Sequence, residues 1–120
     1  MKNHIVLIAE DDPDLRELVA ITLADAGLAV EVACDGREAL ERVAARKPDL
    51  VLLDMMMPVM DGRAFCRELG LTEAPPRVVV MTAADRVAQS AQEVGAVGWL
   101  AKPFDIDDLV ATVRRYLPAS

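Results

Sequence analysis

Five polar side chains with potential for chemistry lie at the ends of short apolar runs in the sequence. They are Glu10, Asp11, Asp54, Thr82 and Lys102. Carboxylates that converge repel one another unless a cation neutralises them, and a set of oxygen ligands suits Mg²⁺. The Asp54 carboxylate could then act as a nucleophile and accept a phosphoryl group as an acyl phosphate. Lys102 and the Thr82 hydroxyl would stabilise the phosphoryl oxygens.

The elements that must position these side chains alternate between two patterns. Unbroken apolar runs predict strands buried on both faces, and stretches of helical periodicity predict the helices between them. We expect strands at residues 5–9, 28–33, 50–53, 78–81 and 98–101, and helices at about 13–26, 35–46, 61–69, 85–94 and 105–117. This order predicts an α/β fold: a doubly wound five-stranded parallel sheet with five helices in a single domain. Ligand sites in such sheets lie beyond the carboxyl ends of the strands, where the five polar side chains fall.

The composition narrows the class of partner. The chain has 120 residues, of which 53% are hydrophobic, a formal net charge of -7 and few aromatic residues (one Trp, one Tyr and two Phe). Direct nucleic-acid binding is disfavoured, because it requires basic patches or stacking platforms. No run approaches the ~20 apolar residues of a membrane span, so we expect a cytoplasmic protein without membrane contact. We expect Cys34 and Cys66 to be reduced and buried, and the only histidine, His4, to have no catalytic role.

Over nearly its whole length the sequence resembles the receiver domain of bacterial two-component response regulators. The matching segments are residues 6–12 (VLIAEDD), 51–54 (VLLD), 57–58 (MP), 60–62 (MDG), 80–83 (VMTA) and 98–104 (GWLAKPF). Each segment alone is a modest signal, but their order at the predicted strand ends is specific. The resemblance implies a CheY-like fold and a phosphorylation-dependent signalling switch.

The resemblance also implies roles for the acidic residues. Asp54 matches the aspartate that accepts the phosphoryl group. Glu10 and Asp11 match the acidic pair that holds Mg²⁺, for which Mn²⁺ can substitute. Asp54 itself and the backbone carbonyl of Met56 match the remaining protein ligands of the metal. Asp12, the next residue along, is not counted as a ligand, because its place before a proline suits a helix cap.

Further positions follow from the same resemblance. Thr82 and Lys102 match the residues that stabilise the phosphoryl group, and the bond between Lys102 and Pro103 matches one that is cis in the family. Trp99 matches the aromatic switch position, where tyrosine or phenylalanine is more usual. Thr82 and Trp99 would relay phosphorylation to the surface of the fourth helix, the fifth strand and the fifth helix.

Two positions tune hydrolysis of the acyl phosphate in this family. One lies two residues after the phosphoacceptor and the other two residues after the threonine, and here they are Met56 and Ala84. Neither side chain can orient an attacking water by hydrogen bonding. The sequence therefore predicts slow self-dephosphorylation.

The first predicted helix carries more apolar residues than one buried face needs. Leu15, Leu18 and Ile21, together with Pro103 and Phe104, are candidates for a patch that docks a helical partner. The resemblance implies that this partner is a histidine kinase or a histidine phosphotransfer protein. A downstream protein target or an output domain would read the switch.

The organisation beyond one domain stays open. We assign residues 1–120 to a receiver domain and expect no output domain in this chain, which ends just after the last predicted helix. A stand-alone receiver and a part of a larger regulator both fit. Thr112 stands about where similar winged-helix regulators have an arginine for dimer salt bridges. A monomer and a phosphorylation-promoted dimer are therefore both kept as alternatives.

Two other classes of protein share part of the pattern. A haloacid-dehalogenase-like phosphatase also combines a nucleophilic aspartate with Mg²⁺, threonine and lysine, but it needs a general acid where this chain has Met56. A flavodoxin-like binder needs a glycine-rich phosphate loop after the first strand, where this chain has carboxylates. We therefore expect no enzymatic activity beyond phosphoryl transfer to Asp54 and its slow hydrolysis.

Overall fold

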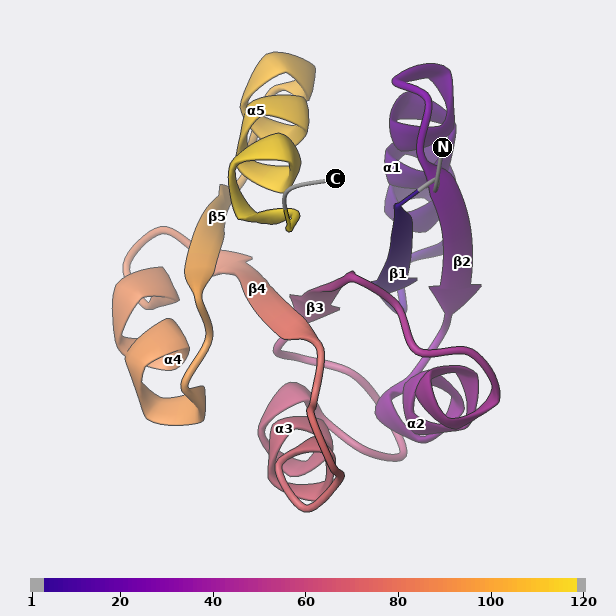
Figure 1. The fold of residues 1–120 in the computed structure, drawn as a ribbon. Coiled ribbons are helices and arrows are strands. Elements are labelled where there is room, and N and C mark those ends of the chain that lie inside the picture. The colour runs from indigo at the N-terminus through magenta and orange to yellow at the C-terminus, as the bar shows by residue number, and fades with distance from the viewer. Residues whose placement is uncertain (1–3, 119–120) are drawn as a thin grey trace.

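Five parallel strands form one sheet in the computed structural model, which describes residues 4–118 (Figure 1). The strands are β1 (Ile5–Ala9), β2 (Ala29–Ala33), β3 (Leu50–Asp54), β4 (Arg77–Ala83) and β5 (Gly98–Lys102). Their order across the sheet is β2-β1-β3-β4-β5. After β1 the chain forms β2 at one edge of the sheet, and it then forms β3, β4 and β5 in turn on the other side of β1. The strand order therefore reverses between β1 and β3, which is where such sheets place their ligand sites.

Helices cover both faces of this sheet (Figure 1). One layer consists of α1 (Pro13–Asp25) and α5 (Ile106–Tyr116), and the other of α2 (Gly36–Ala45), α3 (Gly62–Leu69) and α4 (Val87–Val94). Every residue of β1 and β3 is buried, because successive side chains of these strands point to opposite helix layers. The structure thus confirms the predicted doubly wound α/β fold.

Alternate side chains of the central strands belong to two separate cores. Val6 and Ile8 of β1 pack in a cluster with Val19 of α1. Leu7, between them in the sequence, lies in the other cluster with Phe65 of α3. Each fully buried apolar side chain stabilises the fold by roughly 1.5–3 kcal/mol. The two cores therefore make the sheet a rigid platform for the residues at its carboxyl edge.

Aspartate side chains set the start of four helices. The residues that accept backbone N–H bonds from a first helical turn are Asp12, Asp35, Asp61 and Asp105. Helix α4 differs, because it begins at Val87 and not at residue 85 as predicted. The reason is a turn in which the backbone N–H of Arg86 donates to the carbonyl of Ala83 at 3.0 Å. Gly95 ends α4 with a left-handed φ of 71°, as expected for a glycine after a helix.

The cysteines differ in burial, and the prediction of two buried thiols is wrong for Cys34. Both are free, but Cys34 is exposed and Cys66 is half-buried. Cys34 follows the end of β2, and its sulfur lies beside the carboxylates of Asp35 and Glu38, outside both cores. Burial raises the pKa of Cys66 to about 11, so this thiol stays protonated at neutral pH. Residues 1–3 and 119–120 of the predicted domain lie outside the described part of the chain.

Candidate functional site

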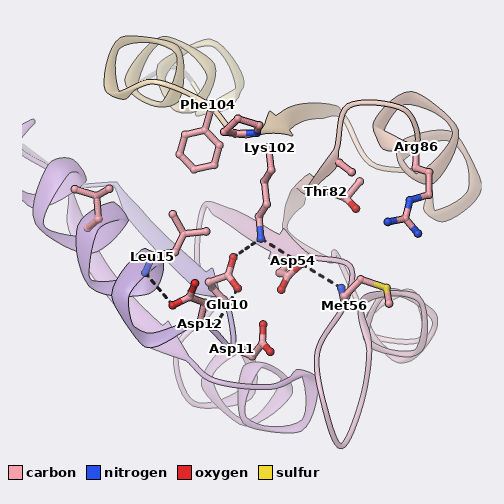
Figure 2. Close-up of a pocket in the computed structure, with 13 residues that line it drawn as sticks. Glu10, Asp11, Asp12, Leu15, Asp54, Met56, Thr82, Arg86, Lys102 and Phe104 are labelled. Atoms are coloured by element: carbon pink, nitrogen blue, oxygen red, sulfur yellow. Dashed lines mark hydrogen bonds and ion pairs between the residues drawn. The ribbon is translucent and has the colours of Figure 1, made fainter.

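A cavity of about 600 Å³ opens at the edge of the sheet where the strand order reverses (Figure 2). It is lined by Glu10, Asp11, Asp12, Leu15, Leu18, Asp54, Met56, Thr82, Ala83, Arg86, Lys102, Pro103 and Phe104. These residues come from the carboxyl ends of β1, β3, β4 and β5, from the segments that follow these strands, and from the first half of α1. The five polar side chains singled out in the sequence therefore share one site.

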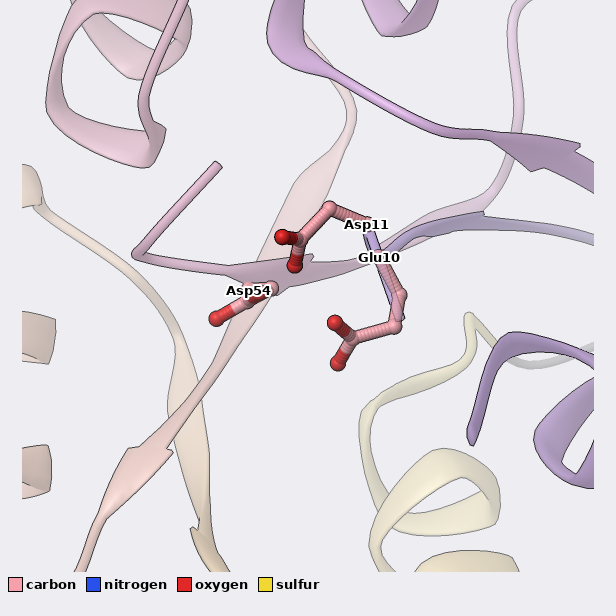
Figure 3. A group of neighbouring side chains, drawn as sticks. All are labelled: Glu10, Asp11 and Asp54. Carbon is pink, nitrogen blue, oxygen red and sulfur yellow. The ribbon is translucent and has the colours of Figure 1, made fainter. Parts of the chain in front are cut away.

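Three carboxylates converge within the cavity (Figure 3). Glu10, Asp11 and Asp54 each place an oxygen within 4.8 Å of the others. Glu10 is 1% exposed and Asp54 is 5% exposed, whereas Asp11 is open to solvent. All three potential metal ligands are oxygen atoms, and one side of the group faces water. This arrangement suits a cation that keeps several waters, such as Mg²⁺. The residues present therefore fit the cation that the sequence implies.

The crowding of the carboxylates changes the proton affinity of Asp54 and Asp11. Burial, hydrogen bonding with Glu10 and Asp11, and the charge of Glu10 raise the pKa of Asp54 from its ordinary 3.8 to about 7. The backbone N–H of Met56, which donates to Asp54 Oδ1 at 3.1 Å, opposes this rise. Burial also disfavours the charged form of Asp11, but hydrogen bonds with Asp54 and Glu10 hold the pKa of Asp11 below its ordinary value. A bound cation would relieve this competition for protons.

Lys102 brings a positive charge to the carboxylates from the end of β5 (Figure 2). Its Nζ lies 2.6 Å from Glu10 Oε1 and 3.5 Å from Asp54 Oδ1. Burial lowers the pKa of the Lys102 ammonium, but these two carboxylates outweigh that effect and raise it. The ammonium therefore stays charged beside the Asp54 carboxylate. The peptide bond between Lys102 and Pro103 is cis, in agreement with the resemblance.

The remaining predicted positions around Asp54 separate into two groups. Thr82 is buried at the end of β4 and lines the cavity, and Met56 lines its rim with a side chain that is 64% exposed. Ala84 is exposed and does not line the cavity. Trp99 lies on β5 opposite Val80 of β4, is 51% exposed and also lies outside the cavity lining. Thr82 and Trp99 thus lie on adjacent strands, and Thr82 pairs with Ala101, two residues after Trp99.

An apolar wall of the cavity contains most of the predicted docking patch. Leu15, Leu18, Pro103 and Phe104 line the cavity, and Leu18 is 48% exposed. Ile21 is exposed as well but lies further along α1 and does not line the cavity. The structure therefore brings four of the five candidates together.

Two arginines beside the site were missed from the sequence. Arg86 precedes α4 and lines the cavity on the side of Thr82 (Figure 2). Arg16, on α1, donates to backbone carbonyls of the loop that follows β1. Arg86 could not be singled out because it falls within the helix predicted at 85–94. Arg16 could not be singled out because its partners are main-chain atoms, which the sequence of residue types does not reveal. Asp12 caps α1 as expected and does not join the carboxylate group, since its Oδ1 accepts bonds from the first turn.

The chain belongs to the response regulator receiver domain family, which it matches over residues 6–114. It is therefore a receiver domain of two-component signalling. It is 40% identical over 114 residues to the response regulator MprA of Mycolicibacterium vanbaalenii, covering 93% of this chain and 49% of that protein. The MprA protein of Mycobacterium leprae is also 40% identical over 114 residues, with 50% of that protein covered. The chain thus spans about half the length of these curated relatives.

Solved structures of receiver domains have the same fold. The chemotaxis response regulator CheY4 of Vibrio cholerae matches with a TM-score of 0.88 and 35% identity over 97% of this chain and 100% of that one. NtrX of Brucella abortus matches with a TM-score of 0.88 and 32% identity over 97% of this chain but 27% of that one. Among the described residues, no helix has the length and apolar character needed to cross a membrane.

Proposed function

We propose that Asp54 accepts a phosphoryl group from a phosphohistidine donor and that the chain acts as a phosphorylation-dependent switch. The observation that carries this proposal is the Asp54 carboxylate lying within reach of two further carboxylates and 3.5 Å from the Lys102 ammonium. A carboxylate oxygen of Asp54 attacks phosphorus while the phosphorus–nitrogen bond to the donor imidazole breaks. The bonding electrons stay on the imidazole nitrogen, and Asp54 carries an acyl phosphate.

The charges on the transferred group require partners. Glu10, Asp11, Asp54 and the backbone carbonyl of Met56 would hold Mg²⁺, or Mn²⁺ in its place. That cation would neutralise negative charge on the phosphoryl oxygens. Lys102 stabilises the same oxygens from the β5 side. The buried Thr82 hydroxyl at the cavity wall donates a hydrogen bond to one of them.

Thr82 also links the site to the surface. We infer that its movement toward the phosphoryl group opens space for Trp99, which lies half-exposed on the neighbouring strand. Rotation of Trp99 then changes the face formed by α4, β5 and α5. Phosphorylation would bias a pre-existing equilibrium between two arrangements of this face. The changed face would then bind a protein target, an output domain or a second copy of the chain in a dimer.

The direct test uses the fluorescence of Trp99, the only tryptophan. Mg²⁺ is expected to change its emission in a saturable manner. Beryllofluoride, a mimic of the phosphoryl group, is expected to give a second saturable change that requires Mg²⁺. A protein that responds to neither ligand and gains no phosphate from acetyl phosphate would overturn the proposed function.

Hydrolysis of the acyl phosphate should be slow, because the Met56 side chain at the cavity rim cannot orient water. Replacing Met56 by asparagine or glutamate is expected to shorten the half-life of the phosphorylated protein by about tenfold. This is less than the roughly 10²–10⁴-fold contribution of a positioned general acid or base, because the new side chain would only orient the attacking water. The decay of the phosphorylated form, followed by intact-mass spectrometry, measures this change. Met56→Leu, which keeps an apolar side chain, serves as the control. A half-life in Met56→Asn equal to that of wild type would contradict the prediction.

The apolar wall is proposed to dock a helical histidine kinase or phosphotransfer domain. Leu18→Asp places a charge in this wall and should slow transfer from a phosphohistidine partner by more than tenfold, since buried charges oppose apolar docking. Labelling by acetyl phosphate, which needs no docking, should stay unchanged. Leu71→Asp is a matched control, because Leu71 is exposed but lies outside the cavity lining. Equal slowing with both phosphodonors would instead indicate damage to the site itself.

A further inference from the structure

Arg16 connects α1 to the loop that carries two of the three clustered carboxylates. Its Nη1 donates to the backbone carbonyl of Glu10 at 2.9 Å and approaches that of Asp11 at 3.5 Å. We propose that Arg16 is a positioning residue for the cation site: it holds this loop so that the Glu10 and Asp11 carboxylates face Asp54. The inference rests on the proposed function, because it concerns the affinity of the same cation.

The contacts of the loop explain why such a residue is needed. Three acidic residues in succession, Glu10, Asp11 and Asp12, follow β1 and repel one another. The backbone N–H of Glu10 donates to the carbonyl of Ala33 at 3.0 Å, which ties the start of the loop to β2. Asp12 is tied to α1, because its Oδ1 accepts bonds from the first helical turn. The carbonyls between these two anchors face the guanidinium of Arg16, which therefore restrains the middle of the loop.

The anchoring of Arg16 itself favours this role. Its backbone N–H donates to the carbonyl of Asp12 at 2.9 Å, within the first turn of α1. The side chain is half-buried, so its guanidinium reaches back along the helix instead of extending into solvent. A planar guanidinium can direct N–H groups toward two neighbouring carbonyls at once, which a lysine ammonium cannot reproduce with the same geometry.

A positioning role of Arg16 and a simple effect of its charge predict opposite changes in cation affinity when Arg16 is removed. A positive side chain near a cation site repels the cation, so its removal would strengthen cation binding if charge alone mattered. If Arg16 positions the carboxylates, its removal weakens binding despite the loss of that repulsion. Replacement of groups that orient metal ligands usually lowers metal affinity by about 10–100-fold.

The experiment measures Mg²⁺ binding by isothermal titration calorimetry on the wild-type chain and its variants. Arg16→Ala is expected to bind Mg²⁺ about tenfold more weakly. Arg16→Lys, which keeps the charge, is also expected to bind more weakly. Arg42→Ala removes the same charge from α2, outside the cavity lining, and should bind like wild type. Urea unfolding without Mg²⁺ measures any structural cost of each variant separately.

The outcomes separate this inference from the proposed function. Unchanged or tighter Mg²⁺ binding by Arg16→Ala, with normal binding by wild type, would overturn the role of Arg16 and leave the cation site standing. A loss of stability in urea with wild-type affinity would make Arg16 structural only and would also overturn the inference. Absence of Mg²⁺ binding by wild type would overturn the proposed site together with the inference. If Arg16→Ala does not fold, the affinity of Arg16→Lys decides.

Discussion

Asp54→Asn is expected to abolish the incorporation of phosphate from acetyl phosphate, because an asparagine amide cannot form an acyl phosphate. Intact-mass spectrometry should detect one added phosphoryl group on the wild-type chain and none on the variant. Asparagine has nearly the same shape as aspartate, and its side-chain oxygen can still accept the bond from the Met56 N–H. The variant should therefore fold, and its Trp99 emission should not respond to beryllofluoride.

Asp12→Asn provides the matched control for this experiment. It removes the same charge from the same cavity, but Asp12 caps α1 and lies outside the carboxylate group. Asparagine is also a good helix cap, so the start of α1 should be preserved. Phosphorylation of Asp12→Asn at the wild-type rate is expected. Phosphate retained by Asp54→Asn would instead place the acceptor on another residue.

The stability of the metal-free domain is expected to fall as pH rises from about 4 to about 7. The pKa of Asp54 rises from its ordinary 3.8 to about 7 in the folded chain, so the folded state holds a proton that the unfolded state has released. Each pKa unit corresponds to about 1.4 kcal/mol. The lowered pKa of Asp11 changes the stability mainly below its ordinary value of 3.8, so it does not oppose the loss between pH 4 and pH 7. We expect a net loss of about 2–4 kcal/mol in the free energy of unfolding over this range.

Urea unfolding at a series of pH values, with and without Mg²⁺, measures this loss. Mg²⁺ should restore the stability at pH 8, because the cation binds the folded state only. Asp54→Asn should be more stable than wild type at pH 8 without metal and should have a flatter pH profile. Asp85→Asn, which changes an exposed carboxylate outside the cavity lining, should keep the wild-type profile. A wild-type stability that is constant between pH 4 and pH 8 would contradict the expectation that folded Asp54 holds a proton in this range.

The strands could be predicted because their signal is local. A residue such as Leu52 is buried wherever it lies in a strand covered on both faces, so an unbroken apolar run is enough. Helix starts with an aspartate cap, such as Asp35 and Asp105, were predictable for the same reason. The start of α4 was not, because the turn before it depends on backbone bonds and no capping side chain stands at Arg86.

The exposure of single residues was less predictable. The surplus of apolar residues on the first helix indicated a patch that includes Leu18 and Ile21, but only the position of the cavity decides that Leu18 lines it and Ile21 does not. Cys34 ends a strand pattern and yet lies outside the cores, since the chain turns away directly after β2. In both cases the surroundings of the residue depend on the path of the folded chain and not on the residue type alone.

The sequence by itself determined which residue types stand at the ends of the strands and, through the parallel α/β pattern, that these ends meet. It therefore identified Asp54, Thr82 and Lys102 as parts of one site. The tertiary structure alone decided how they meet. The ion pair between Lys102 and Glu10 joins residues 92 positions apart, and the bonds of Arg16 go to backbone atoms. Periodicity and capping act over a few residues, whereas such contacts depend on the register and packing of the whole sheet.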